Sequence, residues 1–143
     1  MLARSRQIGH VHYQVAIDAL IFERVEQKEV LVISPQVLIE FYAAATRTIS
    51  NSLGLTPDEA MAEVAKIQED FPLLAESAVI YGNWETLVRK CKPTNRQVFD
   101  ARHVAFMLAH QIPTILSFND QDFSMYSEIQ VLNPFDVLNV PRV

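Results

Sequence analysis

Three carboxylic acids occur in stretches of sequence that otherwise have the apolar character of a protein core. Glu40 lies within VLIEFYAAATR, Asp100 lies within VFDARHVAFMLAH, and Asp122 follows the run TILSFND. Two carboxylates about 4 Å apart repel by roughly 4 kcal/mol at an effective dielectric near 20, so three that converge do not all stay ionised without a counterion. A divalent cation removes this repulsion. If the fold brings the three acids together, the sequence predicts a metal site.

The donor atoms indicate which metal would bind and which reaction it would support. All three side chains donate oxygen, the chain has a single cysteine, Cys91, and its four histidines form no clear pair. Oxygen donors favour Mg²⁺ or Mn²⁺ over Zn²⁺. Such an ion lowers the pKa of a bound water, positions that water against a phosphodiester and neutralises charge on the phosphate. We therefore expect hydrolysis of phosphodiester bonds.

Each acid also has a purely structural interpretation. Glu40 can pair with Arg47 further along its helix. Asp100 can pair with Arg96 one turn earlier, and Asp122 can cap a short helix. Because structural ion pairs also place acids in such positions, no single acid decides between the two interpretations.

The helical phase of two acids predicts where they lie relative to the core. At about 100° per residue, Glu40 falls within about 60° of Val37 and Ala44, and Asp100 falls beside Val104. Both acids are thus expected at the rim of a buried stripe, where a carboxylate is costly unless it is paired, hydrogen-bonded or bound to metal.

The elements that must position these acids alternate between helices and strands. Helical spacing or capping signals predict helices over about 10–28 and 35–48, from about 56, from about 77, and over 96–110; short apolar runs predict strands at 30–33, 71–75, 114–118 and 129–132. This alternation indicates βαβ units, a mostly parallel sheet and helices on both of its faces. Ligands bind at the carboxyl ends of such strands. Asn119, Asp120 and Asp122 occupy that position after TILSF.

Composition restricts the class of protein. The chain has 143 residues, 50% of them hydrophobic and only 20% charged, which favours one layered α/β domain. No run approaches the roughly 18 apolar residues of a membrane span, and the lone cysteine favours a reducing cytoplasm. A net charge of −5 argues against broad nucleic-acid binding. The basic stretch RKCKPTNR at 89–96 is either a solvated helix end or a local track for phosphates.

Taken together, these stretches resemble the PIN-domain family, especially the small VapC-type ribonuclease toxins of type II toxin–antitoxin pairs. The matching stretches, in family order, are LVISPQVLIEFYAAATR at 31–47, DFPLL at 70–74, FDARHVAFMLAH at 99–110 and LSFNDQDF at 116–123. The resemblance implies a three-layer α/β/α fold with a mostly parallel sheet, a Mg²⁺ or Mn²⁺ site, RNA as substrate and a cognate antitoxin as partner. Because proteins similar to this one commonly dimerise, it also implies a possible homodimer.

The resemblance assigns the candidate site residue by residue. Glu40 matches the acid of the family's second helix, Asp100 the acid that opens its DAR helix, and Asp122 the acid of its closing DF element. Asn119 occupies a position where the family often has another polar or acidic residue. Asp120, its neighbour, receives less weight.

The chain departs from the family pattern at its beginning. Similar PIN domains open with a strand that ends in Asp-Thr-Asn, whose Asp is a metal ligand, and this chain starts with sequence that follows that strand. Asp18 does not replace the missing ligand, because its surroundings have helical spacing and it precedes Glu40 by only 22 residues. We therefore expect a single PIN-like domain over residues 1–143 that is truncated at its N-terminus and lacks its first strand.

Three functional alternatives follow. The first is a metal-dependent endoribonuclease that retains three of the four acids. The second is a catalytically inactive PIN-like binding protein, or a truncated relic. A receiver-like signalling domain ranks last, because such a domain needs paired acids on its first strand and a lysine after a late strand, and this sequence has neither.

Overall fold

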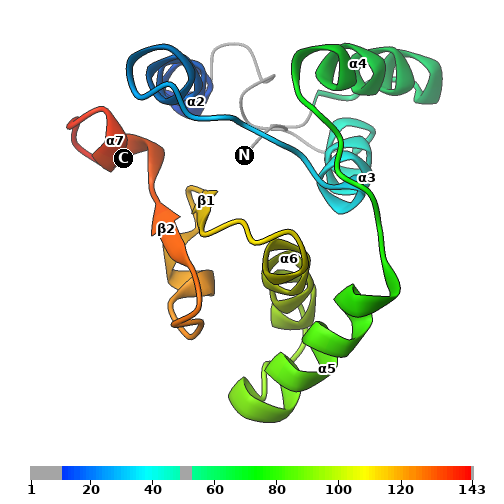
Figure 1. The fold of residues 1–143 in the computed structure, drawn as a ribbon. Coiled ribbons are helices and arrows are strands. Elements are labelled where there is room, and N and C mark those ends of the chain that lie inside the picture. The colour runs from blue at the N-terminus through cyan, green and yellow to red at the C-terminus, as the bar shows by residue number, and fades with distance from the viewer. Residues whose placement is uncertain (1–10, 49–52, 143) are drawn as a thin grey trace. The chain divides into compact units, whose positions relative to one another are not determined.

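The computed structural model describes residues 11–48 and 53–142 of the chain (Figure 1). The chain forms two compact units. The first comprises residues 1–74 together with 134–143, and the second comprises residues 75–133. The prediction of a single domain stays a prediction, since division into compact units describes packing and does not define domains.

The described part of the first unit is helical. It contains α2 (Val11–Ile21), a π-helix η1 (Phe22–Glu26) that continues directly from it, α3 (Pro35–Ala45), α4 (Pro57–Asp70) and α7 (Pro134–Val137). α2 packs beside α7, and α3 packs beside α4 (Figure 1). Asp18 lies on α2, in agreement with the helical spacing around it.

Local capping explains where α3 and α4 begin. Pro35 occupies the first turn of α3, and the hydroxyl of Ser34 accepts a hydrogen bond from the backbone N–H of Val37 at 3.3 Å. α4 begins with a complete capping box. The hydroxyl of Thr56 accepts from the N–H of Glu59 at 3.3 Å, and the Glu59 carboxylate accepts from the N–H of Thr56 at 2.8 Å. Both starts agree with the sequence prediction.

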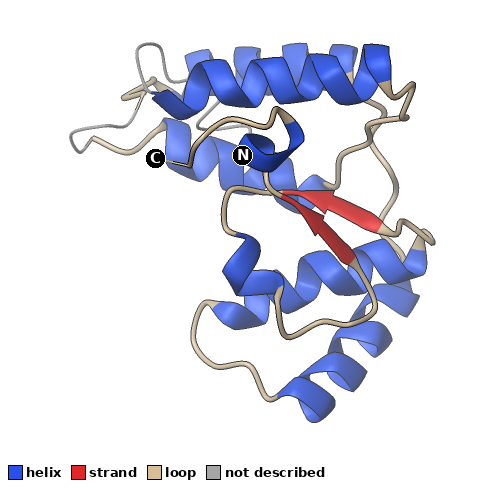
Figure 2. Cartoon of the chain, turned by 90° about the vertical axis from the view of Figure 1, so that its left-hand side faces the viewer, coloured by secondary structure: helices blue, strands red, loops and turns tan. Residues whose placement is uncertain are grey.

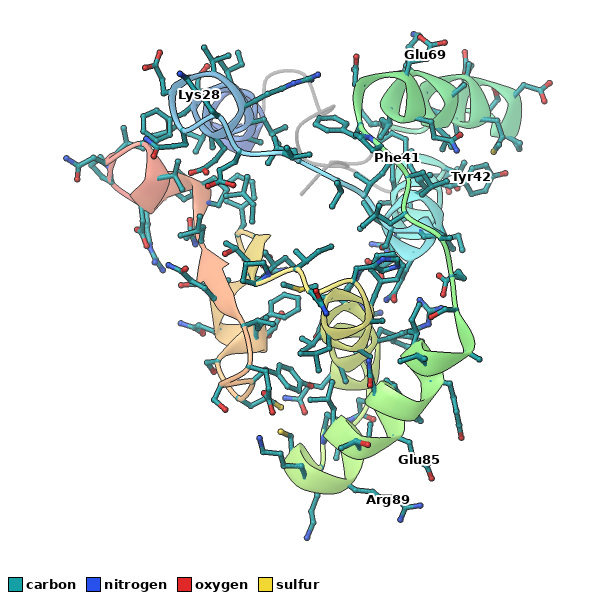
Figure 3. The ribbon with its side chains drawn as sticks, in the orientation of Figure 1. Lys28, Phe41, Tyr42, Glu69, Glu85 and Arg89 are labelled. Atoms are coloured by element: carbon teal, nitrogen blue, oxygen red, sulfur yellow. The ribbon has the colours of Figure 1, made fainter. Side chains whose placement is uncertain are left out.

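The core of the first unit lies between α3 and α4. Seven buried apolar residues form one cluster, which comprises Ile33, Leu38, Phe41, Ala45, Ala60, Val64 and Ile67. Phe41, labelled in Figure 3, is only 1% exposed and lies at the centre of this helix pair. Burial of such side chains typically contributes about 1.5–3 kcal/mol each, so this cluster holds α3 against α4.

The two strands predicted in the first unit meet in a single parallel bridge. Ile33 pairs with Leu73, the N–H of Ile33 donates to the carbonyl of Pro72 at 3.0 Å, and the N–H of Leu74 donates to the carbonyl of Ile33 at 3.0 Å. The parallel direction of this bridge agrees with the predicted parallel sheet, but the described residues form no longer ladder here. Pro72 has no N–H to continue it, and Val30 is 79% exposed.

The second unit contains the parallel strands. Its elements are α5 (Ala78–Cys91), α6 (Gln97–Ala109), β1 (Thr114–Leu116), a 3₁₀-helix η2 (Asp120–Phe123) and β2 (Gln130–Leu132). β1 and β2 pair in parallel, with Ile115 opposite Val131 (Figure 2). Parallel strands joined through helical segments confirm the predicted α/β class.

Two side-chain hydrogen bonds hold α5 against α6. The indole Nε1 of Trp84 donates to the carbonyl of Val98 at 2.8 Å, and the amide of Asn83 donates to the carbonyl of Ala105 at 3.2 Å. The turn between the helices has two residues in the left-handed region, Lys92 at φ 51° and Asn95 at φ 52°. These conformations end α5 and begin α6 where the sequence predicted a break.

The lengths and apolar content of the described helices show whether any of them could cross a membrane. Among residues 11–48 and 53–142, no helix is both long and apolar enough to cross a bilayer.

Candidate active site

Asp100 occupies the first turn of α6 in the second unit. Its side chain is partly buried, while Val104 and Met107, which follow on the same side of the helix, are buried. Asp100 therefore lies at the edge of the buried face, as its helical phase predicted. The α6 position is set by the bond between Trp84 and the carbonyl of Val98, two residues before Asp100.

Asn119 and Asp122 lie beyond the carboxyl end of β1. The N–H of Asn119 donates to the hydroxyl of Ser117 at 3.1 Å, and the N–H of Asp122 donates to the carbonyl of Asn119 at 3.1 Å. This turn becomes η2, a short helix of the kind considered for Asp122 from the sequence. Both side chains are exposed. Asp122 lies inside η2, whose N-cap is Asn119. The alternative interpretation, in which Asp122 only caps a short helix, is therefore wrong.

α6 and η2 pack against each other, which brings the elements of Asp100 and Asp122 together. The rings of His103, on α6, and Phe123, at the end of η2, are 6.5 Å apart between centroids. His103 follows Asp100 by one turn, and Phe123 directly follows Asp122. Two of the three predicted acids thus belong to adjoining elements of one unit.

Glu40 lies on α3 in the first unit, and its predicted position at the rim of the buried stripe is wrong. Its side chain is exposed, and its Oε1 accepts a hydrogen bond from the amide of Gln36 at 2.8 Å. The residues that α3 buries against α4 include Leu38 and Phe41, whereas Val37 is only partly buried. α3 turns the face with Leu38 and Phe41 toward α4, and Glu40 lies outside that face.

Asn133 is a buried polar residue to which the sequence reasoning gave no weight. It is 4% exposed, and its amide donates to the carbonyl of Phe118 and to Oδ1 of Asp120, each at 3.2 Å. Asn133, the residue directly after β2, therefore orients the carboxylate of Asp120. An asparagine between the apolar run IQVL and Pro134, at the carboxyl end of a strand, is the signal that could have identified it.

Tyr126 is the second residue that sequence reasoning missed. It is 2% exposed, and its hydroxyl has no hydrogen-bond partner among the described residues. Burial, followed by the nearby charges of Cys91, Asp100 and Glu128, raises the pKa of Tyr126 to about 12. Tyr126 follows Asp122 by four positions, and its backbone N–H donates to the carbonyl of Phe123, the last residue of η2, at 3.1 Å.

Comparison with known families decides the class of this chain. The PIN domain family matches residues 9–129, which is most of the chain and includes all three predicted acids. The chain belongs to the PIN domain family. PIN domains form a nuclease superfamily that acts on nucleic acid and generally uses divalent metal ions, so the receiver-like alternative is wrong. A search of curated proteins found no match.

The donor set of this PIN domain suits a hard divalent cation, but the described residues do not assemble a complete site. Glu40, Asp100 and Asp122 offer only oxygen, in agreement with the metal use of the family. Across residues 11–48 and 53–142, no three His, Cys, Asp or Glu side chains gather closely enough to hold a metal ion. The metal ligands therefore stay a prediction.

Proposed function

We propose that this PIN domain is a metal-dependent endoribonuclease that hydrolyses RNA phosphodiester bonds and acts as the toxin of a toxin–antitoxin pair. One observation carries the proposal. In a chain of a nuclease family, α6 packs on η2 and so brings the elements of Asp100 and Asp122 together. The ring contact of His103 with Phe123 supplies the geometry.

Each site residue has a proposed role. Glu40, Asp100 and Asp122 would hold Mg²⁺ or Mn²⁺, and Asn119 would offer its amide to a substrate oxygen beside them. When bound, the ion supplies an activated water and neutralises charge on the phosphate. α6 holds Asp100 at the edge of its buried face. Asn119 is fixed through its backbone bond to Ser117.

A circular RNA tests the reaction directly, because only an endonuclease can open it. We expect the purified protein with Mn²⁺ to linearise the circle, and each of Glu40→Gln, Asp100→Asn and Asp122→Asn to slow cleavage by at least about 100-fold. Asp58→Asn, which alters an exposed acid in the first turn of α4, should cleave normally. Equal cleavage by Asp100→Asn and by the unaltered protein would contradict the proposal.

The second candidate function is an inactive PIN-like protein that binds an antitoxin or RNA. The observation that favours it is the local engagement of Glu40, whose Oε1 accepts a hydrogen bond from the amide of Gln36 at 2.8 Å. It predicts a folded protein that opens no circular RNA and binds its partner equally well before and after Asp100→Asn. The same assay therefore separates the two functions.

The biological setting is also a proposal. We propose a cytoplasmic protein that is neutralised by a cognate antitoxin and that can form a homodimer. Its free cysteine, Cys91, suits a reducing compartment. If the protein is a toxin, its expression should arrest growth, co-expression of the antitoxin should restore growth, and Asp100→Asn should abolish the arrest. Growth arrest that Asp100→Asn leaves unchanged would contradict this role.

A further inference from the structure

The second unit has five lysine and arginine side chains, and ion pairs neutralise three of them. Arg89 contacts Glu85 at 2.7 Å, a pair labelled in Figure 3. Lys90 contacts Glu128 at 2.6 Å, and Arg102 contacts Glu76 at 2.8 Å. These pairs cancel charge within the unit. The positive charge left for a ligand therefore depends on the other two basic residues.

Lys92 and Arg96 are those two residues, and both lie in the turn between α5 and α6. Their side chains are exposed, and neither forms an ion pair with any residue in the described part of the chain. The protein as a whole carries a net charge of −5. An RNA strand would be repelled by most of such a surface, so a local positive site has to receive it.

The turn that carries these cations has a fixed shape. Lys92 ends α5 in the left-handed conformation, and Pro93, next to it, is buried. The N–H of Thr94 donates to Oε1 of Gln97 at 3.0 Å, and the N–H of Gln97 donates to the carbonyl of Thr94 at 3.1 Å. A preorganised turn loses less conformational entropy when a ligand binds.

Arg96 also has a defined relation to the candidate active site. It directly precedes α6 with helical backbone angles, φ −67° and ψ −21°, and Asp100 follows four residues later. Residues four apart lie on the same helix face, about 6 Å apart along the axis. The positive end of the α6 dipole lies at the same place. A phosphodiester held beside Asp100 would therefore have its neighbouring backbone close to Arg96.

We infer that the α5–α6 turn is a phosphate-contact site, at which Lys92 and Arg96 bind the backbone of a single-stranded RNA substrate next to the scissile bond. This inference rests on the proposed ribonuclease function. Arginine suits the role because its planar guanidinium forms two parallel hydrogen bonds with a phosphate. Lys92 adds a point charge at the other end of the turn. The site reads charge and not base identity, so it contributes affinity without sequence preference.

The salt dependence of RNA binding tests the inference. Binding of a fluorescein-labelled single-stranded RNA is followed by anisotropy in EDTA, which prevents metal-dependent cleavage, between about 50 and 200 mM salt. Each phosphate contact contributes about 0.7 to the slope of log K against log salt for a single strand, so Lys92→Gln with Arg96→Gln should reduce the slope by about 1.4. At the lowest salt, the Kd of this double variant should rise about tenfold.

Two further variants make the result specific. Lys66→Gln removes an exposed lysine that pairs with Glu63 on α4, and it should leave both the Kd and the salt slope unchanged. Arg96→Lys retains the positive charge, and it should keep the salt slope while weakening binding by a few fold, because lysine cannot form the paired contact. Thermal melts followed by circular dichroism should match for all variants, since both positions are exposed.

The outcomes separate this inference from the proposed function. An RNA affinity and a salt slope that stay the same in the double variant would overturn the phosphate-contact site, even if Asp100→Asn still abolished cleavage. An unaltered protein that binds no RNA at about 50 mM salt would overturn it as well. Conversely, a reduced slope in the double variant, together with an absence of cleavage in the unaltered protein, would support the contact site and count against the catalytic proposal alone.

Discussion

The side-chain amide of Asn133 donates a hydrogen bond to Oδ1 of Asp120 at 3.2 Å. The same nitrogen donates to the carbonyl of Phe118 at 3.2 Å, and the asparagine is buried. A residue at the end of β2 thus fixes the turn that follows β1, and that turn leads into η2 and Asp122. The shape of the candidate site therefore depends on a contact between residues 13 positions apart in the sequence.

Replacement of Asn133 should destabilise the fold measurably. Asn133→Ala leaves the carbonyl of Phe118 and the carboxylate of Asp120, both partly buried, without this donor, which typically costs about 1–3 kcal/mol. The free energy of unfolding from urea titration provides the measurement. Asn119→Ala is the matched control, because its exposed side chain forms no cap bond, and it should change stability by less than about 0.5 kcal/mol. Equal urea midpoints for both variants would show that Asn133 does not hold this turn.

The capping box of α4 should give a stability term that depends on pH. Hydrogen bonds from Thr56 hold the pKa of Glu59 below its usual value of 4.5. Because the folded pKa is lowered, this contribution is present above about pH 4.5 and is lost as the pH falls through the folded pKa. Thr56→Ala should cost about 0.5–2 kcal/mol at pH 7, and less at pH 3.

Thr86→Ala is the control for the capping box. Thr86 is also exposed, but it lies within α5 and donates to the carbonyl of Gly82, so its loss removes no cap. Alanine favours helix more than threonine, so this variant should be as stable as the original protein or slightly more stable. A destabilisation of Thr86→Ala equal to that of Thr56→Ala would count against the capping explanation.

Ionisation of Tyr126 should lower the free energy of unfolding at alkaline pH. Its pKa is raised to about 12 by burial and by neighbouring charges, whereas a phenol in the unfolded chain ionises near 10. The unfolded chain therefore releases this proton first, and stability falls as the pH rises from about 10 to about 12. Tyr126→Phe should remove this part of the alkaline loss. Unfolding curves measured at pH 8 and pH 11 test it, and parallel losses in both proteins would contradict the assignment.

The closing element carries two acids, and their metal affinities should differ. The Asp120 carboxylate already accepts a hydrogen bond from Asn133, whereas Asp122 is exposed and its side chain has no bond with the described residues. We therefore expect Asp122→Asn to weaken Mn²⁺ binding by at least about tenfold, and Asp120→Asn to weaken it less. Isothermal titration of the two variants compares them directly. If Asp120→Asn weakened Mn²⁺ binding more than Asp122→Asn, Asp120 and not Asp122 would be the metal ligand.

Local sequence signals predicted the helices of this chain well. Ser34 with Pro35, and Thr56 with Pro57, lie directly at the starts of α3 and α4, because caps are satisfied within one turn of the backbone. The start of α6 near residue 96 and the presence of parallel strands were predicted on similar grounds. Each of these features depends on residues close together in sequence or on a strong apolar run.

Features that depend on tertiary packing were harder to predict. Periodicity placed Glu40 beside the core, but α4 covers a different face of α3. Asn133 lies directly after β2, and Tyr126 lies after η2. The polar residue between IQVL and Pro134 marks the position of Asn133, but its partners, Phe118 and Asp120, come from a distant part of the sequence. The extent of the bridge at Ile33 depends on Pro72, which cannot continue a ladder.

Mn²⁺ binding to the Asp100→Asn variant tests the central claim most directly, because it removes one charge and retains the shape of the side chain. Isothermal titration of the folded protein should show Mn²⁺ binding that Asp100→Asn weakens by at least about tenfold, while Asp58→Asn binds as the original protein does. If Asp100→Asn and the original protein bind Mn²⁺ with the same affinity, Asp100 is not a metal ligand, and the metal-dependent ribonuclease proposed for this PIN domain is contradicted.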